Sequence, residues 1–441
     1  MQRNLFFKLV VLASLSLLVL IPLNLLEGLV RERAALRSAA QAEIAKGWSG
    51  PQKVRGPVLL VPYNEKHIET AYLPEEEGTV SRVVKRQLSK KVVPSEIRTS
   101  SVLSVEERSL GVYRFPIYLA RLQIDAKFDL PPELTSETGL THTALILGLS
   151  DPSAIQGAPS CSVLNTRADL VPGAASLFEK GVSAQLPVPV SELPSQLHIQ
   201  CELEFRGSAS LAVLPNGKSA EISISGNWPH VNLSSSFMPA ERKIDSGSFS
   251  SIWKVSSFAQ DWAGSPDGCG ATQESCSSGA RQEAAVSMLT PVDIYTQVNR
   301  SVKYASLFCL LTFTAFFLFE ILKKLRIHPV QYGLVAMALS AFYLLLLSLS
   351  EHIGFGASYL TAAAACISLI AVYVRAVLAT AARTAGFCGG LALLYASLYI
   401  VLQSEDFALL MGSSILFGVL SLFMITTRNI NWYEVGRSRE V

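Results

Sequence analysis

Residues 304–322 read YASLFCLLTFTAFFLFEIL, an apolar run with one acidic residue near its end. As a helix that rises about 1.5 Å per residue, such a run is long enough to cross roughly 30 Å of hydrocarbon. Further apolar runs follow at 332–349, 356–374, 384–402 and 408–425. Because an unpaired backbone group in lipid costs several kcal/mol, all five runs are expected to be membrane-spanning helices.

The N-terminal region supplies a sixth apolar run. Residues 9–26 follow Arg3 and Lys8, and this pattern suits either a membrane anchor or a cleaved signal peptide. No small-x-small cleavage site follows the run, which favours an uncleaved anchor. The next stretch, 27–48, keeps a helical spacing of apolar residues, so we expect a helix that continues from the first span.

Charged residues between the apolar runs predict the orientation, because lysine and arginine remain on the cytoplasmic side. The connections after spans two, four and six hold the basic residues Lys323, Lys324, Arg326, Arg375, Arg383, Arg428, Arg437 and Arg439. The alternate connections hold Glu351–His352 and Glu405–Asp406. We therefore expect both termini inside and the segment between spans one and two outside. Arg31 and Arg33 oppose this orientation, but they begin a long translocated segment and have acidic neighbours.

Composition agrees with a membrane protein that carries a soluble domain. Half of the residues are apolar and only 16% are charged, and the apolar residues concentrate after position 304. The 37 basic and 35 acidic residues nearly balance, and no long basic run is present. The sequence therefore indicates the lipid bilayer as a partner and gives no sign of nucleic-acid binding.

The region between the first two spans has the alternation of β-strands. Residues 122–130 and 197–205 place apolar side chains on one face and polar side chains on the other. Residues 215–218, Pro-Asn-Gly-Lys, predict a two-residue hairpin turn in which Val213 opposes Ala220. Other expected strands lie at 58–62, 101–105, 144–149 and 252–255. Several short strands of this kind suggest a sandwich or two packed sheets.

Four of the seven cysteines lie in this region, Cys161, Cys201, Cys269 and Cys276. Cys201 faces the predicted core, either as a thiol or as half of a disulfide with Cys161. Cys269 and Cys276 could close a short loop, since disulfides persist outside the cytoplasm. The sequence holds no Cys-x-x-Cys and no neighbouring histidine pair, so we expect no metal site.

Several stretches resemble one known family. They include Ser225–His230, Phe237–Arg242, Pro291–Tyr295, Ile327–Tyr332, Phe342–Ser348 and Ser350–Phe355, together with Ser49–Gln52 and Gly56–Pro57. These residues resemble the CreD (Cet) family of bacterial inner-membrane proteins over almost the whole chain. The resemblance implies an inner membrane of Gram-negative type and a link to envelope integrity and envelope stress. It implies no catalytic residue.

We therefore predict an α+β membrane protein with six transmembrane helices, one N-terminal and five C-terminal. A large β-rich, sandwich-like periplasmic domain is inserted between the first and second helices. The expected divisions are an anchor at 1–26, a juxtamembrane helix at 27–48, the periplasmic domain at 49–300, a five-helix bundle at 301–428 and a cytoplasmic tail at 429–441.

Motifs for enzyme chemistry are absent or weak. The phosphate-binding loop and the Gly-x-Ser-x-Gly turn are missing. Ser251 and Lys254 match Ser-x-x-Lys, but a strand would place them on opposite faces and the companion motifs are missing. We therefore expect no enzyme, no catalytic residue and no cofactor.

Four residues remain as candidates for a partner or ligand surface. Trp228 and His230 flank a rigid proline and could form a flat contact, or they could close a turn and pack under the domain. Glu351 and His352 could form a proton-responsive pair, or they could simply end a helix. Glu320 could be a functional acid or the partner of nearby lysines.

The leading functional hypothesis is a non-enzymatic protein that supports envelope integrity or the envelope-stress response. Its outer domain would bind an envelope protein or a peptidoglycan-related component. The alternative is a transporter or lipid-handling protein that uses the five C-terminal helices. The centres of the spans lack ionisable residues, which weakens an ion-coupled transporter.

Overall fold

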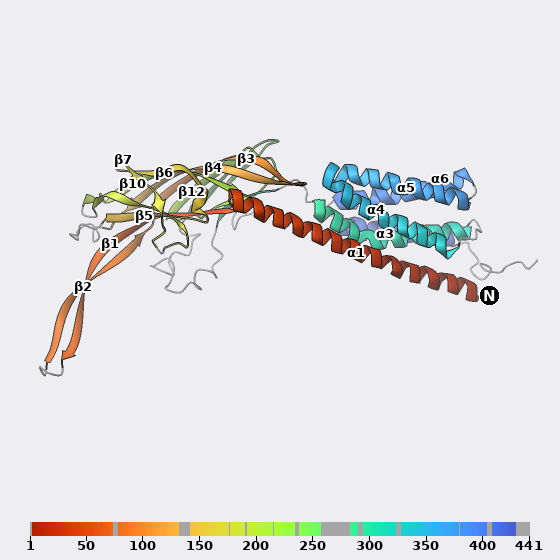
Figure 1. Cartoon of the computed structure of the whole chain (residues 1–441), viewed down its shortest axis with the longest axis horizontal. Coiled ribbons are helices and arrows are strands. Elements are labelled where there is room, and N and C mark those ends of the chain that lie inside the picture. Colours follow the sequence, from red (N-terminus) through yellow and green to blue (C-terminus); the bar gives the residue numbers. More distant parts are fainter. Residues whose placement is uncertain are drawn as a thin grey trace, which may run out of the picture. The chain divides into compact units, whose positions relative to one another are not determined.

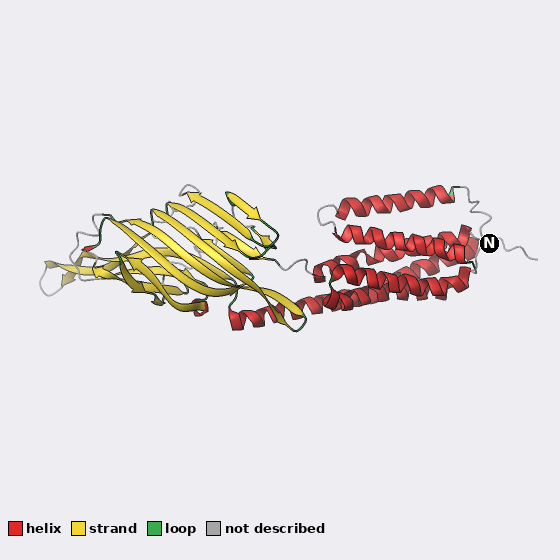
Figure 2. Cartoon of the chain, turned by 90° about the horizontal axis from the view of Figure 1, so that it is seen from above, coloured by secondary structure: helices red, strands yellow, loops and turns green. Residues whose placement is uncertain are grey.

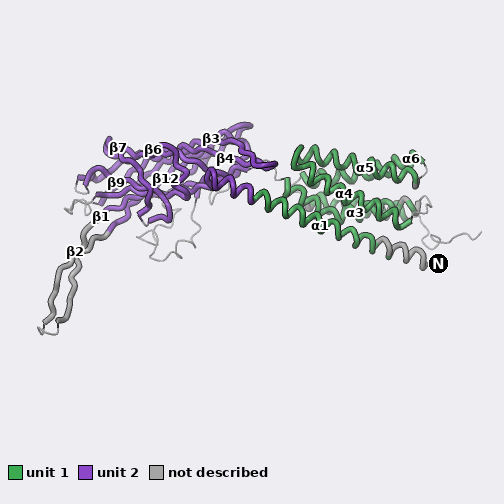
Figure 3. Tube along the Cα trace, in the orientation of Figure 1, with its two compact units in different colours: residues 1–38, 292–441 green, residues 39–291 purple. Residues whose placement is uncertain are grey.

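A computed structural model describes residues 2–73, 78–131, 142–175, 177–189, 192–214, 216–233, 238–256, 283–289, 294–322, 328–378, 380–403 and 408–428. The chain divides into two compact units, coloured separately in Figure 3. One comprises residues 1–38 with 292–441, and the other comprises residues 39–291. The short loop that Cys269 and Cys276 could close lies outside the described residues, as do the connections 323–327 and 404–407.

The first unit is helical. Its helices are α1 (Gln2–Trp48), α3 (Ile294–Leu322), α4 (Pro329–Ile353), α5 (Phe355–Leu378), α6 (Ala381–Gln403) and α7 (Ala408–Thr427). Each of these six helices, counted over the described residues, is long and apolar enough to cross a membrane. The predicted pattern of one N-terminal and five C-terminal spans is confirmed.

Two helices extend further than their apolar runs. α3 begins at Ile294, well before the predicted start at Tyr304. The prediction placed the start too late because the first turns of the helix contain polar residues, which interrupt the apolar run. α1 continues without interruption through Pro22 to Trp48, and its last residues belong to the second unit.

The second unit contains two eight-stranded sheets in its described part, and Figure 2 shows the broad face of strands. The first sheet is built from β1 (Gln52–Leu73), β2 (Gly78–Val92), β5 (His142–Leu149), β8 (Val171–Pro172), β9 (Gly181–Pro189), β11 (Ser210–Leu214), β13 (Val231–Asn232) and β16 (Ala284–Met288). Its order is β13-β16-β11-β1-β5-β9-β8, with β2 paired to β1. In Figure 1 the β1–β2 hairpin projects from this sheet.

The second sheet is built from β3 (Glu96–Leu110), β4 (Tyr113–Asp129), β6 (Ile155–Val163), β7 (Thr166–Asp169), β10 (Gln196–Ser208), β12 (Ser219–Gly226), β14 (Glu241–Ile244) and β15 (Phe249–Ser256). Its order is β14-β15-β12-β3-β4-β10-β6-β7. Burial alternates strictly along most of β3 and β10, so one face of the sheet is buried and the other is exposed to solvent.

One hydrophobic core lies between the buried faces of the two sheets. Its large, fully buried side chains include Leu59, Leu103, Leu122, Phe128, Phe205 and Trp253. Burying a side chain of this size contributes about 1.5–3 kcal/mol relative to leaving it exposed. The predicted strands at 58–62, 101–105, 144–149, 197–205 and 252–255 lie within strands of the sandwich, and the one at 122–130 extends one residue beyond β4.

The predicted hairpin at 215–218 is wrong. β11 pairs with β1 and β16 in the first sheet, whereas β12 pairs with β3 and β15 in the second. Both strands face the shared core from opposite sheets, and this arrangement satisfies the same apolar alternation as a hairpin. Gly217 has a φ of +154°, and a Cβ there would lie 2.9 Å from the Pro94 carbonyl oxygen, so the glycine serves a crossing between sheets.

Polar side chains fix the point where α1 enters the sandwich. Ser49 Oγ donates a hydrogen bond of 2.7 Å to Asp151 Oδ2 and accepts one of 2.7 Å from Gln52 Nε2. Gln52 Oε1 accepts from the Asp151 amide, and Ser208 Oγ donates to the Ser49 carbonyl. Ser49 has a φ of 115°, so the network holds the chain in a conformation that L residues rarely adopt.

Candidate functional site

Trp228 and His230 lie between β12 and β13, close to the end of β16. Their rings are 6.5 Å apart in an edge-on arrangement. Trp228 is half-buried against the core, and its Nε1 donates a 3.1 Å hydrogen bond to the Leu289 carbonyl. The Leu289 amide donates to the His230 carbonyl, while the His230 side chain is exposed. The indole therefore has a packing role, and the imidazole is open to solvent.

Glu351 and His352 are not brought together. Glu351 accepts a 2.9 Å hydrogen bond from Tyr295 Oη, and its Oε2 lies 3.9 Å from Nη1 of Arg33. It thereby links α1, α3 and α4 at one end of the bundle. His352 is exposed on another side of α4, as the turn of about 100° between adjacent helical residues requires.

Glu320 lies near the other end of α3. The residue is buried, and it accepts a 2.9 Å hydrogen bond from Tyr332 Oη on α4. A carboxylate removed from water needs such donors, because leaving it without them would cost several kcal/mol. The contact fixes the separation of the two helices.

Aromatic side chains fill the centre of the helical unit. Tyr359 Oη donates to the Tyr395 carbonyl at 2.8 Å, and Tyr395 Oη donates to Cys366 Sγ at 3.2 Å. The Phe342 ring packs edge-on against both tyrosine rings. These contacts tie α4, α5 and α6 together. They hold no charge that could accept or release an ion.

A cavity of about 40 Å³ lies between α3, α6 and α7. Leucine, isoleucine and valine side chains form most of its lining, with Tyr304, Phe308 and Ser397. A space of this size accommodates one or two waters, and an apolar lining gives water few partners.

The solvent-exposed face of the second sheet carries a polar cluster. Asp125 on β4 contacts His198 Nε2 at 2.6 Å and accepts from Gln200 Nε2 at 3.2 Å. Partial burial raises the pKa of Asp125, but the hydrogen bonds from His198 and Gln200 outweigh it and hold that pKa below its usual range. Sequence reasoning assigned these residues only to the outer faces of strands, because the register between β4 and β10 is not visible in one strand alone.

A second contact missed from the sequence surrounds Trp48, the last residue of α1. Arg206 lies 4.5 Å and Arg108 lies 5.7 Å from the ring centroid, and both are within cation–π range. Trp48 Nε1 donates to the Tyr118 carbonyl at 3.3 Å. The end of the long helix is therefore locked to β3, β4 and β10.

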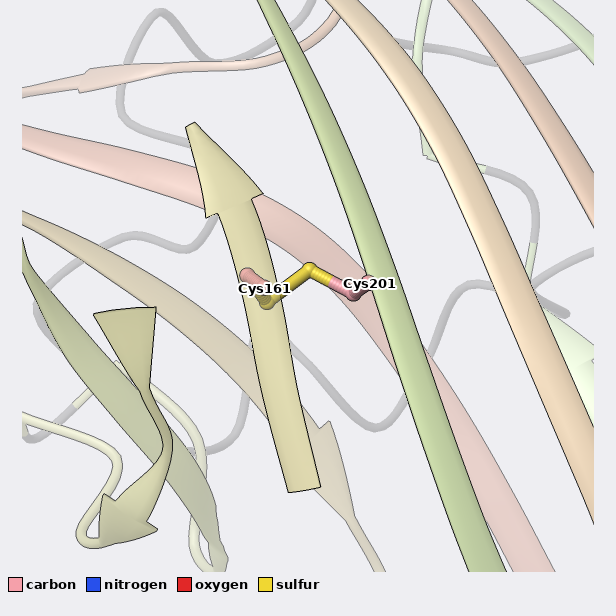
Figure 4. Close-up of a disulfide and its surroundings, with 2 residues drawn as sticks. All are labelled: Cys161 and Cys201. Carbon is pink, nitrogen blue, oxygen red and sulfur yellow. A yellow bond between two sulfur atoms is a disulfide. The ribbon is translucent and has the colours of Figure 1, made fainter. Parts of the chain in front are cut away.

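Cys161 and Cys201 form a disulfide, shown in Figure 4. They face each other in register on β6 and β10, with Cα atoms 4.0 Å apart. Of the two possibilities left open by the sequence, the disulfide is the one that forms. Among the described residues, no group of three or more His, Cys, Asp or Glu side chains could hold a metal ion.

Comparison with known proteins identifies the family. The family model described as "Inner membrane protein CreD" matches residues 4–433. Inner membrane protein CreD of Escherichia coli (strain K12) is 33% identical over 447 aligned residues, which cover 98% of this chain and 95% of that relative. The chain belongs to the CreD family of inner membrane proteins. It is therefore a multi-pass protein of the inner membrane.

Two stretches that resemble CreD lie at structural junctions of the sandwich. Ser49–Gln52 forms the polar network at the end of α1, and Gly56–Pro57 lies in β1 with a cis peptide bond. A Cβ at Gly56 would lie 3.0 Å from the Ile146 carbonyl oxygen.

Among solved structures, the chain is similar to an M1 zinc metallopeptidase from Deinococcus radiodurans and to a mutant of that enzyme bound to a Tyr-ser-ala substrate. The identities are 8% and 9%, and the TM-scores are 0.20 and 0.19. Each match covers 37% of this chain and 39% of the other. At this level we transfer neither fold nor activity to the CreD chain.

Proposed function

We propose that this CreD-family protein is non-enzymatic and supports envelope integrity or the response to envelope stress. Its sandwich would stand in the periplasm and bind an envelope protein or a peptidoglycan-related component. Both termini would lie in the cytoplasm. The helical unit anchors the protein in the lipid bilayer.

The observation that carries the periplasmic placement is the Cys161–Cys201 disulfide. Structural disulfides persist in the periplasm and are rare in the cytoplasm, where thiols are kept reduced. The bond lies in the core of the large unit rather than at a loop tip, since both cysteines are buried. The bond therefore supports a sandwich that folds in an oxidising compartment.

Labelling of single cysteines in intact cells tests the placement. Met238 is 92% exposed in the sandwich, and Arg428 is exposed just after α7. The variants Met238→Cys and Arg428→Cys would be made in a background in which the remaining cysteines outside the disulfide are replaced, namely Cys269, Cys276, Cys309, Cys366 and Cys388. A membrane-impermeant maleimide should label position 238 before lysis and position 428 only after it. The reverse order would refute the periplasmic placement.

A photoreactive residue tests the binding role. It should replace His230, whose side chain is exposed, because the half-buried indole of Trp228 packs against the core. A matched probe at Leu164, in the turn between β6 and β7, reports non-specific capture. Crosslinks to one envelope component at 230 and not at 164 support the proposal, together with detergent sensitivity of cells that carry His230→Ala. Equal capture at both positions and unchanged sensitivity would argue against this surface.

The transporter alternative has less support. A path for a solute through the five C-terminal helices needs polar groups or a continuous space. The bundle centre is filled by aromatic rings, and the cavity between α3, α6 and α7 is apolar and about 40 Å³. Substrate-dependent flux in proteoliposomes would instead favour the transporter hypothesis.

A further inference from the structure

The tip of the β3–β4 hairpin carries apolar side chains into solvent. Leu110 is 41% exposed and Val112 is 47% exposed, on either side of Gly111. Gly111 has a φ of +61° at the first position of a two-residue loop, the conformation that hairpin turns with a leading glycine adopt. The apolar pair is therefore held at the very end of a tight turn.

This hairpin extends beyond its neighbours in the sheet, as Figures 1 and 2 show. β12 accompanies β3 as far as Leu103, and β10 accompanies β4 as far as Ile117. All residues of β3 after Val105 are exposed. Phe115 and Pro116 at the base of the hairpin are buried, so the part that projects runs from Arg114 to the turn at Gly111, roughly 10 Å at about 3.4 Å per residue. A projecting two-stranded ribbon has little stability of its own, and exposed apolar residues at its tip add none.

The hairpin projects from the end of the sandwich at which the chain enters and leaves. Trp48, where α1 ends, lies against Arg108 of the hairpin. The Met288 amide at the end of β16 donates to the Ala209 carbonyl, and the Ala209 amide donates to the Pro116 carbonyl at 3.5 Å. The base of the projecting ribbon, the end of α1 and the end of β16 are thus neighbours.

The second connection between the sandwich and the helices is short. Leu289 follows β16, and α3 begins at Ile294. Five Cα steps span at most about 18 Å when fully extended. The end of β16, which neighbours the base of the hairpin, is therefore tied closely to the start of a membrane-spanning helix.

Charges on the hairpin follow the order found at a lipid surface. Behind the apolar tip come Tyr113, Arg114 and Arg108, and the acidic residues Glu107 and Glu106 lie further back. Aromatic and arginine side chains favour the headgroup layer, where arginine also pairs with phosphate. Glu107 lies 3.9 Å from Arg114, at the base of the hairpin tip.

We propose that the β3–β4 hairpin tip, Leu110 to Arg114, is a lipid-contact site that inserts into the headgroup layer of the membrane that this chain spans. Leu110 and Val112 enter the boundary with the acyl chains, and Arg114 contacts phosphate oxygens. The inference requires only that the sandwich is tethered to the bilayer, so it is independent of the compartment and of the bound envelope component.

The test uses the full-length protein in nanodiscs of phosphatidylcholine and phosphatidylglycerol. Leu110→Cys would carry an environment-sensitive fluorophore in the background that lacks the other free cysteines. The matched control is Leu164→Cys, because Leu164 is also a leucine in a hairpin turn and is 43% exposed. It lies at the opposite end of the same sheet, since Val163, Ile199 and Ala126 are in register and Ala126 to Tyr113 spans about 44 Å of β4.

Spin-labelled phosphatidylcholine in the nanodisc should quench the probe at position 110 and blue-shift its emission, with neither effect at position 164. Adding Val112→Asp to the Leu110→Cys variant should abolish the quenching without changing the melting temperature. Equal signals at 110 and 164 would overturn the proposal. A blue shift at 110 without quenching would also overturn it, because the tip would then contact protein rather than lipid.

Nanodiscs expose both faces of the bilayer, so this result does not depend on which side holds the sandwich. A failed lipid contact would leave the periplasmic proposal intact. Conversely, a cytoplasmic sandwich, detected by maleimide labelling at position 238, would leave the lipid contact intact.

Discussion

Ser49 Oγ donates a 2.7 Å hydrogen bond to Asp151 Oδ2. This bond joins the residue that follows α1 to the segment that follows β5. The other carboxylate oxygen accepts from the amide and the hydroxyl of Ser153. Partial burial raises the pKa of Asp151, but the hydrogen bonds from Ser153 and Ser49 outweigh it, and the pKa is held below its usual range. The ionised carboxylate therefore stabilises the junction between helix and sandwich.

Replacing this carboxylate should lower stability in a pH-dependent manner. Asp151→Asn should cost about 1–3 kcal/mol near neutral pH, because hydrogen bonds to a charged acceptor are lost. A depressed folded-state pKa contributes stability that is complete above the unfolded pKa of about 3.9 and is lost as pH falls through the folded value. Thermal unfolding in detergent should show a large difference between variant and wild type at neutral pH and a small one in acid.

Asp169→Asn is the matched control for that measurement. Asp169 is an exposed aspartate on β7 with one ion pair, to Arg167 at 3.1 Å, and exposed pairs contribute little. A shift as large in the control as in Asp151→Asn would show that the buried network has no special role.

The disulfide should contribute strongly to the stability of the sandwich. Cys161 and Cys201 are 40 residues apart in sequence, and closing a loop of this order restricts the unfolded chain. Replacing both with alanine should cost about 2–4 kcal/mol. Alkylation tests whether the bond is present. In the denatured wild type without reductant, the two thiols should not be alkylated, and they should become available after reduction. If alkylation is complete without reductant, the bond is absent.

Much of the fold follows from local patterns. The spans are long apolar runs. In strands such as 197–205, apolar and polar residues alternate with period two because one face is buried in the core. Pairing is different, since the register of β11 with β1 joins residues far apart in sequence. The Asn216–Gly217 turn predicted a hairpin because local sequence reports a sharp turn and does not report which sheet receives the next strand.

The candidate sites show the same division. Trp228 and Glu351 stood out by residue type, but their partners Leu289 and Arg33 are distant in sequence. The Leu110 turn carried a readable signal, a leading glycine in a two-residue loop between alternating segments, and sequence reasoning did not use it. The cluster around Trp48 carried no such signal, because its arginines come from two separate strands.

Glu351 should act as a clamp between helices rather than as half of a pair with His352. Glu351→Ala removes the acceptor for Tyr295 Oη and the partner of Arg33, so it should cost about 1–3 kcal/mol, while Glu351→Gln keeps an acceptor and should cost less. His352→Ala changes an exposed side chain and should have little effect. Unfolding in mixed micelles at increasing SDS gives the comparison. A larger loss for His352→Ala than for Glu351→Ala would reverse this assignment.

Trp228 and His230 should separate stability from binding. Trp228→Phe keeps most of the packing but loses the hydrogen bond to the Leu289 carbonyl, so it should lower the free energy of unfolding by about 1 kcal/mol. His230→Ala should leave that free energy unchanged, because its imidazole is exposed and only its backbone carbonyl is bonded. Thermal unfolding measures the first effect, and crosslinking yield to the envelope component measures the second. If His230→Ala destabilises the sandwich as much as Trp228→Phe, its imidazole belongs to the packing and any loss of crosslinking no longer identifies a binding surface.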